Sequence, residues 1–487
     1  MTALRSLPMM LSGLVDKDQI PALEITGLEL DSRRLQAGDG FVALAGSQGH
    51  GLDYLEQVVA TGATVVLHDG RAVVPADCPV PAVEVPALAE KLETLAKRFW
   101  GDPSENMDLV AVTGTNGKSS VSWLLAQALD GAMIGTLGVG RPGACRKGNM
   151  TTPDLLSLYR ELAGLRDAGL KTVVMEASSH ALDQGRLNGL EFSSVIFTTL
   201  GHDHLDYHPD LQAYGAAKAR LFFDYSSDRQ LINLDDAFGQ GLAERLGESA
   251  HLIGYSLAGH PQARVRAESV FCDRDGLHAE LSVDERRLSV RSQLIGRVNL
   301  WNLLIVAGEL AARDCSDSEI TQALGRLDPV PGRMQPVRHG ESRLAVVDYA
   351  HTPDALCNAL ESLRELTPRE LWCVFGCGGD RDRAKRPSMG RIAESLADRV
   401  VLTDDNPRRE DPLAIIRGIQ AGMHRPERCL VIRDRAEAIA RAVSASLAGD
   451  VVLIAGKGHE SEQIIGDERR PFDDVACVRD ALEAMPC

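Results

Sequence analysis

The run Gly114-Thr115-Asn116-Gly117-Lys118-Ser119 carries the groups best suited to bind phosphate. Glycines let the backbone approach an anion closely, and successive N–H groups at the start of a helix face it. Lys118 would pair with the β- and γ-phosphates of a nucleotide, and the Ser119 hydroxyl would reach a Mg2+ ion that bridges them. Val112 stands where the common fingerprint has glycine, so the pattern is only partly met and a fortuitous turn stays an alternative.

Mg2+ usually takes one or two further protein ligands besides the phosphates. Two candidates follow the next predicted strands: Glu176, in Glu-Ala-Ser-Ser-His, and His204, in His-Asp-His-Leu-Asp-Tyr-His. A zinc site or a plain polar loop is the alternative interpretation of the histidine-rich residues 202–208. The absence of neighbouring cysteines disfavours zinc.

A second set of polar side chains lies in the last third of the chain, where each of four predicted strands ends in a polar cluster. The clusters are Asp348-Tyr-Ala-His351, Gly378-Gly-Asp-Arg381, Asp405-Asn-Pro-Arg408 and Gly456-Lys-Gly-His-Glu460. The carboxyl ends of the strands share one edge in an open α/β sheet, so we expect these clusters to form one crevice. Guanidinium and carboxylate groups together suit a zwitterionic ligand.

Strands and helices must position these groups. The phosphate-loop candidate follows an apolar strand at 109–113 and precedes a helix at 120–129, and further strands are predicted at 172–175, 195–199 and 231–234. After a Pro-Val-Pro-Gly run at 329–332, strands at 344–347, 371–375, 399–402 and 451–455 alternate with helices. The intervals are long enough for crossover helices, which predicts parallel sheets.

Composition narrows the class of protein. With 487 residues, 44% of them hydrophobic, the chain can bury several cores. A formal charge of -17, from 52 basic and 69 acidic residues, argues against a protein built mainly to hold nucleic acid or an anionic membrane. We therefore expect neither nucleic acid nor a membrane among its partners. A monomer is expected as well, although composition does not decide the oligomeric state.

The ten cysteines are scattered, and the closest pair, Cys373 and Cys377, lacks the spacing of a zinc site. Reduced structural thiols are the expected state. The first residues have no long apolar core, and no run of about 18 apolar residues occurs. These features predict a cytoplasmic protein.

Taken together, the motifs resemble the Mur ligase family, and within it the branch that adds meso-diaminopimelate to UDP-N-acetylmuramoyl-L-alanyl-D-glutamate. The resemblance spans essentially the whole chain, on residues 114–120, 176–180, 203–208, 348–353, 405–408 and 456–460. It implies an α/β protein of three domains: a small N-terminal module for the uridine nucleotide at 1–96, a central P-loop ATPase with a parallel sheet at 97–330, and a C-terminal Rossmann-like domain for the amino acid at 331–487.

The family's chemistry implies that a substrate carboxylate attacks the ATP γ-phosphate, and that the amine of the amino acid then displaces phosphate from the acyl phosphate. Catalytic roles are implied for Lys118, Glu176, His204 and Lys218. By resemblance, Lys218 is carbamylated and helps to hold magnesium, with Ser119, Glu176 and His204 as the other metal ligands. A carbamate presents the hard anionic oxygens that Mg2+ requires, whereas a lysine amine does not.

The resemblance also implies which residues bind ATP. Besides the phosphate loop, an asparagine pair, an arginine and two residues beyond the linker would approach the nucleotide, and domain closure would keep water from the acyl phosphate. The implied ATP-binding residues are Gly114, Thr115, Asn116, Gly117, Lys118, Ser119, Ser120, Asn299, Asn302, Arg333, Asp348 and His351.

The implied ligands of the UDP-linked substrate lie in the first two domains. They are Leu30, Ser32, Ser47, Gln48, Gly49, Thr151, Thr152, Ser178, Gln184 and Arg186. Met150 departs from the family pattern, which often has asparagine there, so no polar contact is carried over to it. Ser119 and Ser120 replace the commoner threonines, which keeps the metal-binding hydroxyl.

Asp405-Asn-Pro-Arg408 marks diaminopimelate users in the family. Diaminopimelate differs from lysine by a distal carboxylate, which an arginine such as Arg408 can bind in bidentate fashion. Lysine would leave that arginine unpaired, which discriminates well. The implied diaminopimelate-binding residues are Arg381, Asp405, Asn406, Pro407, Arg408, Gly456 and Glu460, of which Glu460 and the Gly456 carbonyl would receive the distal ammonium.

Three alternatives stay open at this point. Another ligase of the superfamily, such as folylpolyglutamate synthase or the ligase that adds the D-alanyl dipeptide, is disfavoured by Asp405–Arg408 and by Leu-Asp-Ser-Arg at 30–33. A nucleotide-dependent kinase or switch protein would have no reason for the C-terminal clusters. A binding protein that has lost catalysis is disfavoured by Lys118, Glu176, His204 and Lys218.

Overall fold

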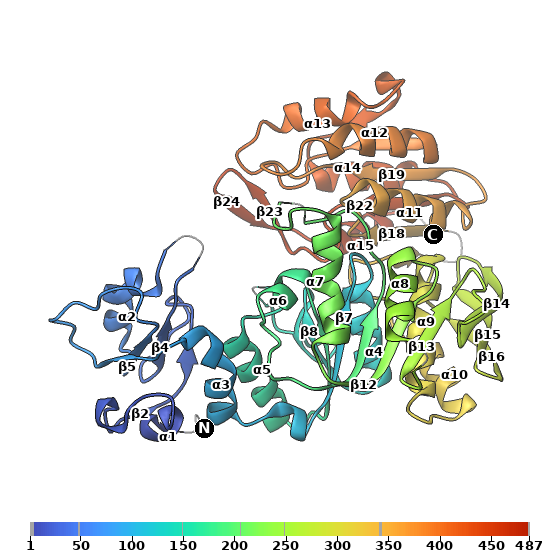
Figure 1. The fold of residues 1–487 in the computed structure, drawn as a ribbon. Helices are drawn as coiled ribbons and strands as arrows, with labels where there is room; N and C mark the ends of the chain where they lie inside the picture. Colours follow the sequence, from blue (N-terminus) through green and yellow to red (C-terminus); the bar gives the residue numbers. More distant parts are fainter. Residues whose placement is uncertain are drawn as a thin grey trace. The chain divides into compact units, whose positions relative to one another are not determined.

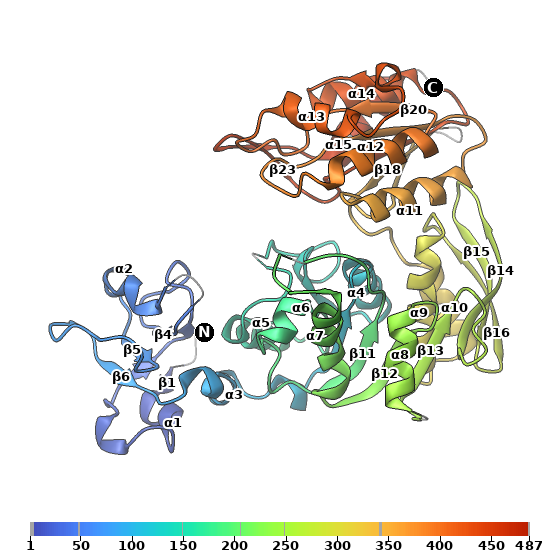
Figure 2. The ribbon, with the colours of Figure 1, turned by 45° about the horizontal axis from the view of Figure 1, so that its top comes forward.

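Figures 1 and 2 show the chain as a computed structural model, which describes residues 4–46, 49–148, 150–204, 206–247, 249–339 and 343–485. The chain divides into two compact units, one of Met1–Ser122 with Leu129–Gln230 and the other of Trp123–Ala128 with Leu231–Cys487. Helices and parallel sheets alternate in both, so the predicted α/β class is confirmed. The three-domain division at 96 and 330 stays a prediction.

The first hundred residues build a small parallel sheet of order β3-β4-β5-β6. Its apolar side chains, among them Phe41 and Val66, pack in one small core with Val58 of helix α2, which connects β4 to β5. The elements are β1 (Arg5–Ser6), α1 (Leu7–Leu11), β2 (Glu24–Ile25), β3 (Leu28–Glu29), β4 (Gly40–Ala43), α2 (Leu55–Thr61), β5 (Val65–His68), β6 (Ala82–Glu84) and α3 (Leu92–Trp100). The small α/β module predicted from the sequence is therefore present.

The rest of the first unit is a sheet of order β11-β7-β10-β8-β9, in which β9 alone among these described strands runs antiparallel to its neighbour. Residues 109–112 are buried on both faces, as expected for a strand between two parallel neighbours. The strands are β7 (Asp108–Thr113), β8 (Ala132–Gly135), β9 (Gly138–Gly140), β10 (Thr172–Glu176) and β11 (Phe192–Phe197), and the helices are α4 (Lys118–Ala128), α5 (Leu155–Asp167), α6 (Ser179–Asp183) and α7 (Leu211–Phe223). The strands predicted at 109–113, 172–175 and 195–199 are thus confirmed, within a few residues at their ends.

Apart from residues 123–128 of α4, the second unit begins within β12 (Ser227–Asn233), which includes most of the strand predicted at 231–234. Strands β14, β15 and β16 then form an antiparallel meander that Figure 2 shows as neighbouring ribbons. Burial alternates along β16, as in an antiparallel sheet with one covered face, and this meander was not predicted. The elements are α8 (Ala237–Leu246), β13 (Leu252–Ser256), β14 (Val265–Cys272), β15 (Leu277–Val283), β16 (Arg286–Ser292), α9 (Val298–Ala311) and α10 (Asp317–Gly325).

The C-terminal part of the second unit is a sheet of order β17-β18-β22-β19-β20-β21, parallel except for the edge strand β17. All four strands predicted after the linker are confirmed as β18, β19, β20 and β22. The strands are β17 (Gln335–His339), β18 (Arg343–Asp348), β19 (Leu371–Phe375), β20 (Arg399–Leu402), β21 (Leu430–Val431), β22 (Val451–Ala455), β23 (Glu462–Ile465) and β24 (Glu468–Pro471), and the helices are α11 (Pro353–Arg364), α12 (Lys385–Leu396), α13 (Pro412–Gln420), α14 (Arg435–Ala445) and α15 (Asp474–Glu483).

Alternate residues of these parallel strands build two cores. Leu344, Cys373 and Leu453 pack with helices α11, α12 and α13 on one face, and alternate residues such as Val374 and Val452 pack with α14 and α15 on the other. The sheet is therefore doubly wound, and the carboxyl ends of its parallel strands share one edge.

Short 3-10 helices occupy Lys17–Gln19, Gly51–Tyr54, Leu88–Lys91, Pro103–Glu105 and Pro426–Arg428. The predicted linker is confirmed as irregular, since residues 327–330 have no regular structure and 331–334 are turns and bends. Among the helices of the described ranges, none combines the length and apolar composition that a membrane span needs.

Candidate active site

The phosphate-loop candidate connects β7 to α4, as predicted. Gly114 (φ 146°) and Gly117 (φ 88°) both adopt backbone angles that other residues rarely adopt. A Cβ on Gly114 would overlap Thr198 Oγ1 and lie 3.0 Å from Thr199 N, whereas Gly117 has ordinary room. Thr115 N donates to Thr199 O at 2.7 Å, so the loop is fastened to the chain that follows β11.

Lys118 and Lys218 meet at this loop. Each Nζ donates to Gly114 O at 2.8 Å, and Lys118 Nζ also donates to Thr115 O at 3.0 Å. Lys218 is 1% exposed and its Nζ lies 4.3 Å from the centre of the Tyr214 ring. Burial, and after it the nearby Lys118 charge, lower the pKa of Lys218 well below its usual value. A neutral amine can attack CO2, so this lysine is suited to carbamylation.

Glu176 lies at the end of β10, buried and with both carboxylate oxygens occupied. Thr136 N donates to Oε1 at 2.7 Å, and Thr136 Oγ1 donates to Oε2 at 3.2 Å. A Cβ atom on Gly135 would overlap Glu176 Oε1, so a glycine is needed beside this carboxylate. Thr136 was not predicted, although its place directly after β8, next to β10 in the sheet, is the signal that could have found it.

His204 has a left-handed backbone (φ 54°) and packs against aromatic rings. Its ring centre lies 4.9 Å from that of His180 and 6.1 Å from that of Tyr214. Burial is the main cause that lowers the pKa of His204, and the cations of Lys118 and Lys218 add to it. The lowered pKa favours the neutral ring, which can offer a nitrogen to a cation.

The donor set can be tested against the two metals considered. Within the described ranges, no group of three or more His, Cys, Asp or Glu side chains is placed to hold a metal ion. That is unlike a zinc site, which needs three or four protein ligands. It suits Mg2+, which keeps waters and phosphate oxygens and takes few protein ligands, such as the buried Glu176 and the Ser119 hydroxyl at the start of α4.

Four predicted ligands of the UDP-linked substrate contact one another in the first unit. Thr152 Oγ1 lies 3.2 Å from Ser178 Oγ, and Arg186 donates to Thr152 O at 2.8 Å and to Gln184 Oε1 at 2.6 Å. Burial lowers the pKa of Arg186. Thr151 joins the set through Thr136, at 3.0 Å between their hydroxyl oxygens. Arg186 Nη1 also donates to the Met150 sulfur at 3.5 Å, the position to which no contact was assigned.

Other predicted ligands lie in the N-terminal module. Leu30 N donates to Glu29 Oε1 at 3.0 Å, Ser32 Oγ lies 3.3 Å from Gln57 Oε1, and Gly49 O accepts from Gly46 N at 2.7 Å. Ser47 and Gln48 lie outside the described residues. Sequence reasoning missed the fully buried Glu29, which also accepts from Arg160 of α5 at 2.7 Å.

The predicted ATP residues of the second unit form two groups. In α9, Asn302 Nδ2 donates to Asn299 Oδ1 at 2.8 Å, and Asn299 Nδ2 donates to Ile295 O at 2.8 Å. After the linker, the Arg333 guanidinium carbon lies 4.4 Å from the Tyr349 ring centre. Arg333 Nε is buried and has no hydrogen-bond partner in the described part of the chain.

Asp348 and His351 follow β18. Asp348 Oδ2 accepts from Met334 N at 2.7 Å, and burial raises the pKa of Asp348 although the Arg333 charge opposes this. His351 Nδ1 donates to Tyr349 O at 2.8 Å, and Lys385 Nζ donates to His351 O at 2.8 Å. These contacts connect the turn after β18 to Met334 and to Lys385.

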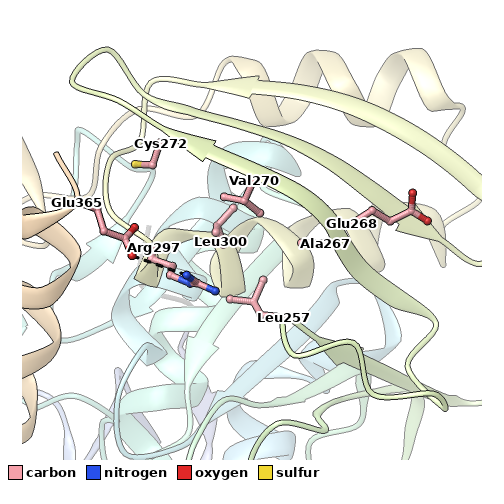
Figure 3. Close-up of a pocket in the computed structure, with 8 residues that line it drawn as sticks. All are labelled: Leu257, Ala267, Glu268, Val270, Cys272, Arg297, Leu300 and Glu365. Carbon is pink, nitrogen blue, oxygen red and sulfur yellow. Dashed lines mark ion pairs between the residues drawn. The ribbon is translucent and has the colours of Figure 1, made fainter.

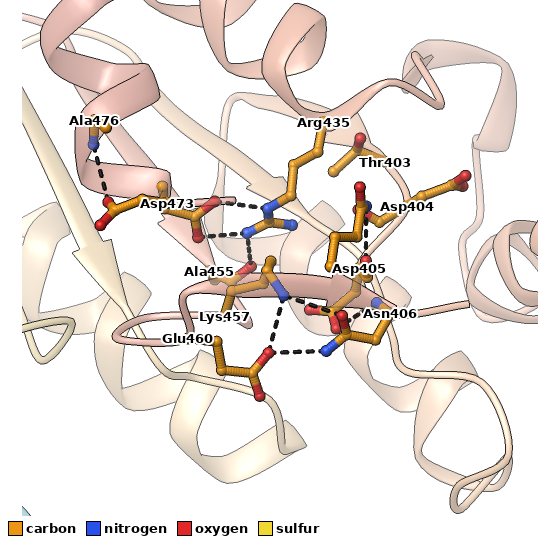
Figure 4. Close-up of polar contacts among 12 residues, drawn as sticks. Thr403, Asp404, Asp405, Asn406, Arg435, Ala455, Lys457, Glu460, Asp473 and Ala476 are labelled. Atoms are coloured by element: carbon orange, nitrogen blue, oxygen red, sulfur yellow. Dashed lines mark hydrogen bonds and ion pairs between the residues drawn. The ribbon is translucent and has the colours of Figure 1, made fainter. Parts of the chain in front are cut away.

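The four C-terminal clusters converge, as predicted. Gly456 N donates to Asp348 O at 3.1 Å, and Gly379 N donates to Asn406 O at 2.9 Å. Asn406 Nδ2 donates to Glu460 Oε2 at 2.8 Å, a contact shown in Figure 4. Arginine, amide and carboxylate groups therefore share one edge of the sheet.

Arg408, which was assigned to the distal carboxylate, has a left-handed backbone (φ 51°) and donates from Nη1 to Gly379 O at 2.8 Å. Pro407 and Asp405 of the same loop are buried, whereas Arg381 is exposed and donates from Nη1 to Asp380 O at 3.5 Å. The structure thus gathers the predicted diaminopimelate residues at one edge of the sheet, where the exposed Arg381 and the half-buried Arg408 both lie beside Gly378.

An ion pair behind this crevice was missed. Arg386 donates to both oxygens of Glu410, at 2.7 and 2.8 Å, and is 3% exposed. These hydrogen bonds lower the pKa of Glu410 to about 2. Because Glu410 Oε2 also accepts from Asp380 N at 3.2 Å, the pair ties the loop at Asp380 to the loop at Arg408.

A cavity of about 290 Å3 lies elsewhere in the second unit (Figure 3). It is bordered by Leu257, Val270, Cys272, Leu300, Arg297 and Glu365, and the last two form an ion pair at 3.7 Å. No predicted site residue lines it. The cavity therefore does not alter the assignment of the site.

Comparison with known proteins agrees with this geometry. Residues 24–100 match the model "Mur ligase family, catalytic domain", residues 112–310 match "Mur ligase middle domain", and residues 332–458 match "Mur ligase, glutamate ligase domain". The three matches leave out little besides the linkers and the two ends of the chain.

Whole relatives match over nearly their full length. A UDP-N-acetylmuramoyl-L-alanyl-D-glutamate--2,6-diaminopimelate ligase of Xanthomonas campestris is 49% identical, over 94% of this chain and 94% of the relative. The protein of that name from Xylella fastidiosa is 47% identical, over 99% of this chain and 98% of the relative. A solved structure of that name is 35% identical, with a TM-score of 0.70 and 99% of both chains covered. The chain belongs to the Mur ligase family.

Proposed function

We propose that this chain is an ATP-dependent ligase that joins meso-diaminopimelate to UDP-N-acetylmuramoyl-L-alanyl-D-glutamate, with release of ADP and phosphate, in peptidoglycan precursor synthesis. Relatives 49% and 47% identical carry the name of this ligase. The observation that carries the proposal is the convergence of Asn406, Arg408 and Glu460 at the carboxyl edge of the C-terminal sheet.

The crevice suits the distal end of diaminopimelate, which bears both an ammonium and a carboxylate. Arg408 uses one N–H group on Gly379 O, and its fork can still present others to a carboxylate. Glu460, next to Asn406, is the complementary acceptor for the ammonium. L-Lysine has no distal carboxylate, so binding it would leave Arg408 without an anionic partner, a penalty that favours diaminopimelate.

The first reaction step takes place at the phosphate loop. A carboxylate oxygen of the UDP-linked substrate attacks the γ-phosphorus of ATP, the bond to the β-phosphate oxygen breaks, and ADP leaves. Lys118 and the N–H groups at the start of α4 stabilise the negative charge on the phosphates. The amine of the amino acid then attacks the acyl carbon and displaces phosphate, which forms the amide bond.

Magnesium and a carbamate on Lys218 complete this proposal. Ser119, Glu176, His204 and the carbamate oxygens would hold the ions, which supply positive charge beside the phosphates. Burial of Lys218 beside the phosphate loop supports the modification, because a carbamate there would face the same space as the Lys118 ammonium. The UDP-linked substrate would contact the cluster of Thr152, Ser178, Gln184 and Arg186.

The remaining parts of the proposal concern organisation. The N-terminal module binds the uridine nucleotide, the central domain binds ATP, and the C-terminal domain binds the amino acid. The protein works in the cytoplasm as a monomer, without nucleic acid or membrane partners.

An amino-acid panel tests the proposal. Phosphate release from ATP should require both the muramoyl dipeptide and meso-diaminopimelate, and mass spectrometry should find the UDP-linked tripeptide. Omission of either substrate is the matched control. Equal phosphate release with L-lysine would overturn the specificity, and release without any amino acid would overturn the ligase assignment.

A further inference from the structure

Lys457 follows β22 and is fully buried in the C-terminal part of the second unit. Its Nζ donates three hydrogen bonds: to Asn406 Oδ1 at 3.1 Å, to Glu460 Oε2 at 2.9 Å and to Glu462 O at 2.7 Å. Figure 4 shows the ammonium between the first two of these groups. An ammonium has three N–H donors, so its capacity is used completely, which is what the burial of a charge requires.

The contacts of Lys457 fix the orientation of Asn406. The amide oxygen of Asn406 accepts from Lys457 and from Ile464 N at 2.9 Å, and the amide nitrogen donates to Glu460 Oε2 at 2.8 Å. Rotation of the amide by half a turn would point N–H groups at the Lys457 ammonium, so only one orientation is compatible with these partners.

The same contacts leave one side of Glu460 available. Its Oε2 accepts two hydrogen bonds, from Lys457 and Asn406, whereas Oε1 accepts none from the residues that the structure describes. The Glu460 side chain is 31% exposed. A cationic ligand can therefore reach Oε1 from solvent while Oε2 stays anchored.

We propose that Lys457 is a positioning residue of the amino-acid site, which anchors Glu460 and Asn406 so that Glu460 Oε1 meets the distal ammonium of the substrate. This inference rests on the proposed function and adds to it a residue that does not itself touch the ligand.

Two effects of Lys457 oppose each other. Its positive charge weakens the attraction of Glu460 for an ammonium, but its hydrogen bonds hold the carboxylate in place. Without Lys457, Glu460 would keep one bond, to Asn406, and could turn towards water. Placing the Glu460 carboxylate within hydrogen-bond distance of the substrate ammonium stabilises the complex more than the repulsion between Lys457 and that ammonium destabilises it. Removal of Lys457 should therefore weaken binding of the amino acid.

The test is a double-mutant cycle with Lys457→Met, Glu460→Gln and the double variant. Lys457→Met should raise KM for meso-diaminopimelate about tenfold or more, with KM for ATP and for the dipeptide within about twofold. The double variant should have the KM of Glu460→Gln, because Lys457 acts through Glu460. If KM in the double variant rises by the product of the two single-variant factors, Lys457 acts independently of Glu460 and the inference is wrong. An unchanged KM for meso-diaminopimelate in Lys457→Met would also overturn it.

Leu453→Ala is the matched control for a general loss of stability. Leu453 lies in β22, is fully buried and packs in the hydrophobic core that the sheet forms with helices α11, α12 and α13. It makes no part of the hydrogen-bonded cluster around Lys457. It should lower the unfolding temperature and leave KM for meso-diaminopimelate unchanged. A parallel rise of this KM in Leu453→Ala would mean that Lys457 has only a structural role.

If Lys457→Met fails to fold, Lys457→Gln is the second variant, because it keeps N–H donors at this position. It should also raise KM for meso-diaminopimelate, but by less than Lys457→Met. A folded Lys457→Gln enzyme with unchanged KM, or one in which kcat alone falls, contradicts the inference. A wild-type enzyme that releases no phosphate with meso-diaminopimelate contradicts the proposed function instead, so the two failures can be told apart.

Discussion

Lys118 and Lys218 donate hydrogen bonds to the same oxygen, the carbonyl oxygen of Gly114, each at 2.8 Å. Positive charge on both amines at one acceptor would be repulsive, and burial and the Lys118 charge disfavour the charged form of Lys218, as its lowered pKa indicates. Carbamylation would replace this repulsion by attraction, because a carbamate is an anion beside the Lys118 cation.

The first prediction concerns Lys218→Ala. Because the variant cannot form a carbamate, its ligase activity should fall by a factor of about 100 or more, the scale expected when a metal-binding or charge-stabilising group is lost. Bicarbonate alone or short carboxylates should restore part of the activity by filling the space of the carbamate. The measurement is phosphate release, together with 13C NMR of wild-type enzyme in 13C-bicarbonate, which should show a carbamate carbon.

Lys171→Ala is the control, because Lys171 is an exposed lysine outside the site. It should keep full activity and the carbamate signal. A fully active Lys218→Ala enzyme would remove the carbamate from the proposal.

The second prediction concerns Gly114→Ala. The φ of 146° and the overlap of an added Cβ with Thr198 Oγ1 would force the loop to move. We expect ATP affinity, measured by calorimetry, to fall about tenfold or more, since the loop amides would lose their alignment. Gly169→Ala is the matched control: it has φ 83° but no neighbour within 4 Å.

Gly169→Ala should cost about 1 kcal/mol of unfolding free energy from backbone strain alone and leave ATP binding unchanged. If Gly114→Ala behaves in the same way, the close approach to Thr198 has no role in nucleotide binding.

The third prediction is that Arg408→Lys chiefly raises the apparent KM for meso-diaminopimelate. Lysine keeps the positive charge but loses the fork that reaches Gly379 O and a carboxylate together. A rise of about tenfold is expected, with KM for ATP unchanged, in a steady-state assay at saturating dipeptide. Loss of nucleotide binding alone would show that the crevice has been misassigned. Arg409→Lys, an exposed neighbour paired with Asp467, is the control and should have normal kinetics.

Sequence reasoning located the elements whose pattern is local. The strand before Gly114, the helix after Ser119 and the four C-terminal strands have apolar runs that can be recognised without knowledge of the fold. The convergence of Asn406, Arg408 and Glu460 was also predictable, because it follows from one topological rule about parallel sheets.

Supporting residues were not predictable in the same way. Thr136, Lys457 and the Arg386–Glu410 pair act through contacts with residues between 3 and 51 positions away, and nothing in their local sequence indicates which partners they contact. The antiparallel strands β14 to β16 were missed because their alternating pattern lies between segments that were interpreted as α/β.

The last prediction concerns Glu410, whose pKa the hydrogen bonds from Arg386 lower from 4.5 to about 2. A folded-state pKa below the unfolded value means that the pair stabilises the protein above pH 4.5, and that this contribution is lost as the pH falls towards 2. At pH 7, Glu410→Gln should lower the free energy of unfolding by about 2 kcal/mol, because the nearly buried Arg386 loses its charged partner.

Urea unfolding of both proteins across this pH range checks the sign. The difference between wild type and Glu410→Gln should be constant from pH 7 to pH 5 and shrink at lower pH, since the wild-type carboxylate becomes protonated. Glu468→Gln is the control: its partner Arg470 is 56% exposed, so solvent screens this surface pair and the free energy of unfolding should stay close to that of wild type at every pH. A difference that grows as the pH falls would mean that Glu410 is neutral in the folded protein, and that the loops at Asp380 and Arg408 are held together by something other than this ion pair.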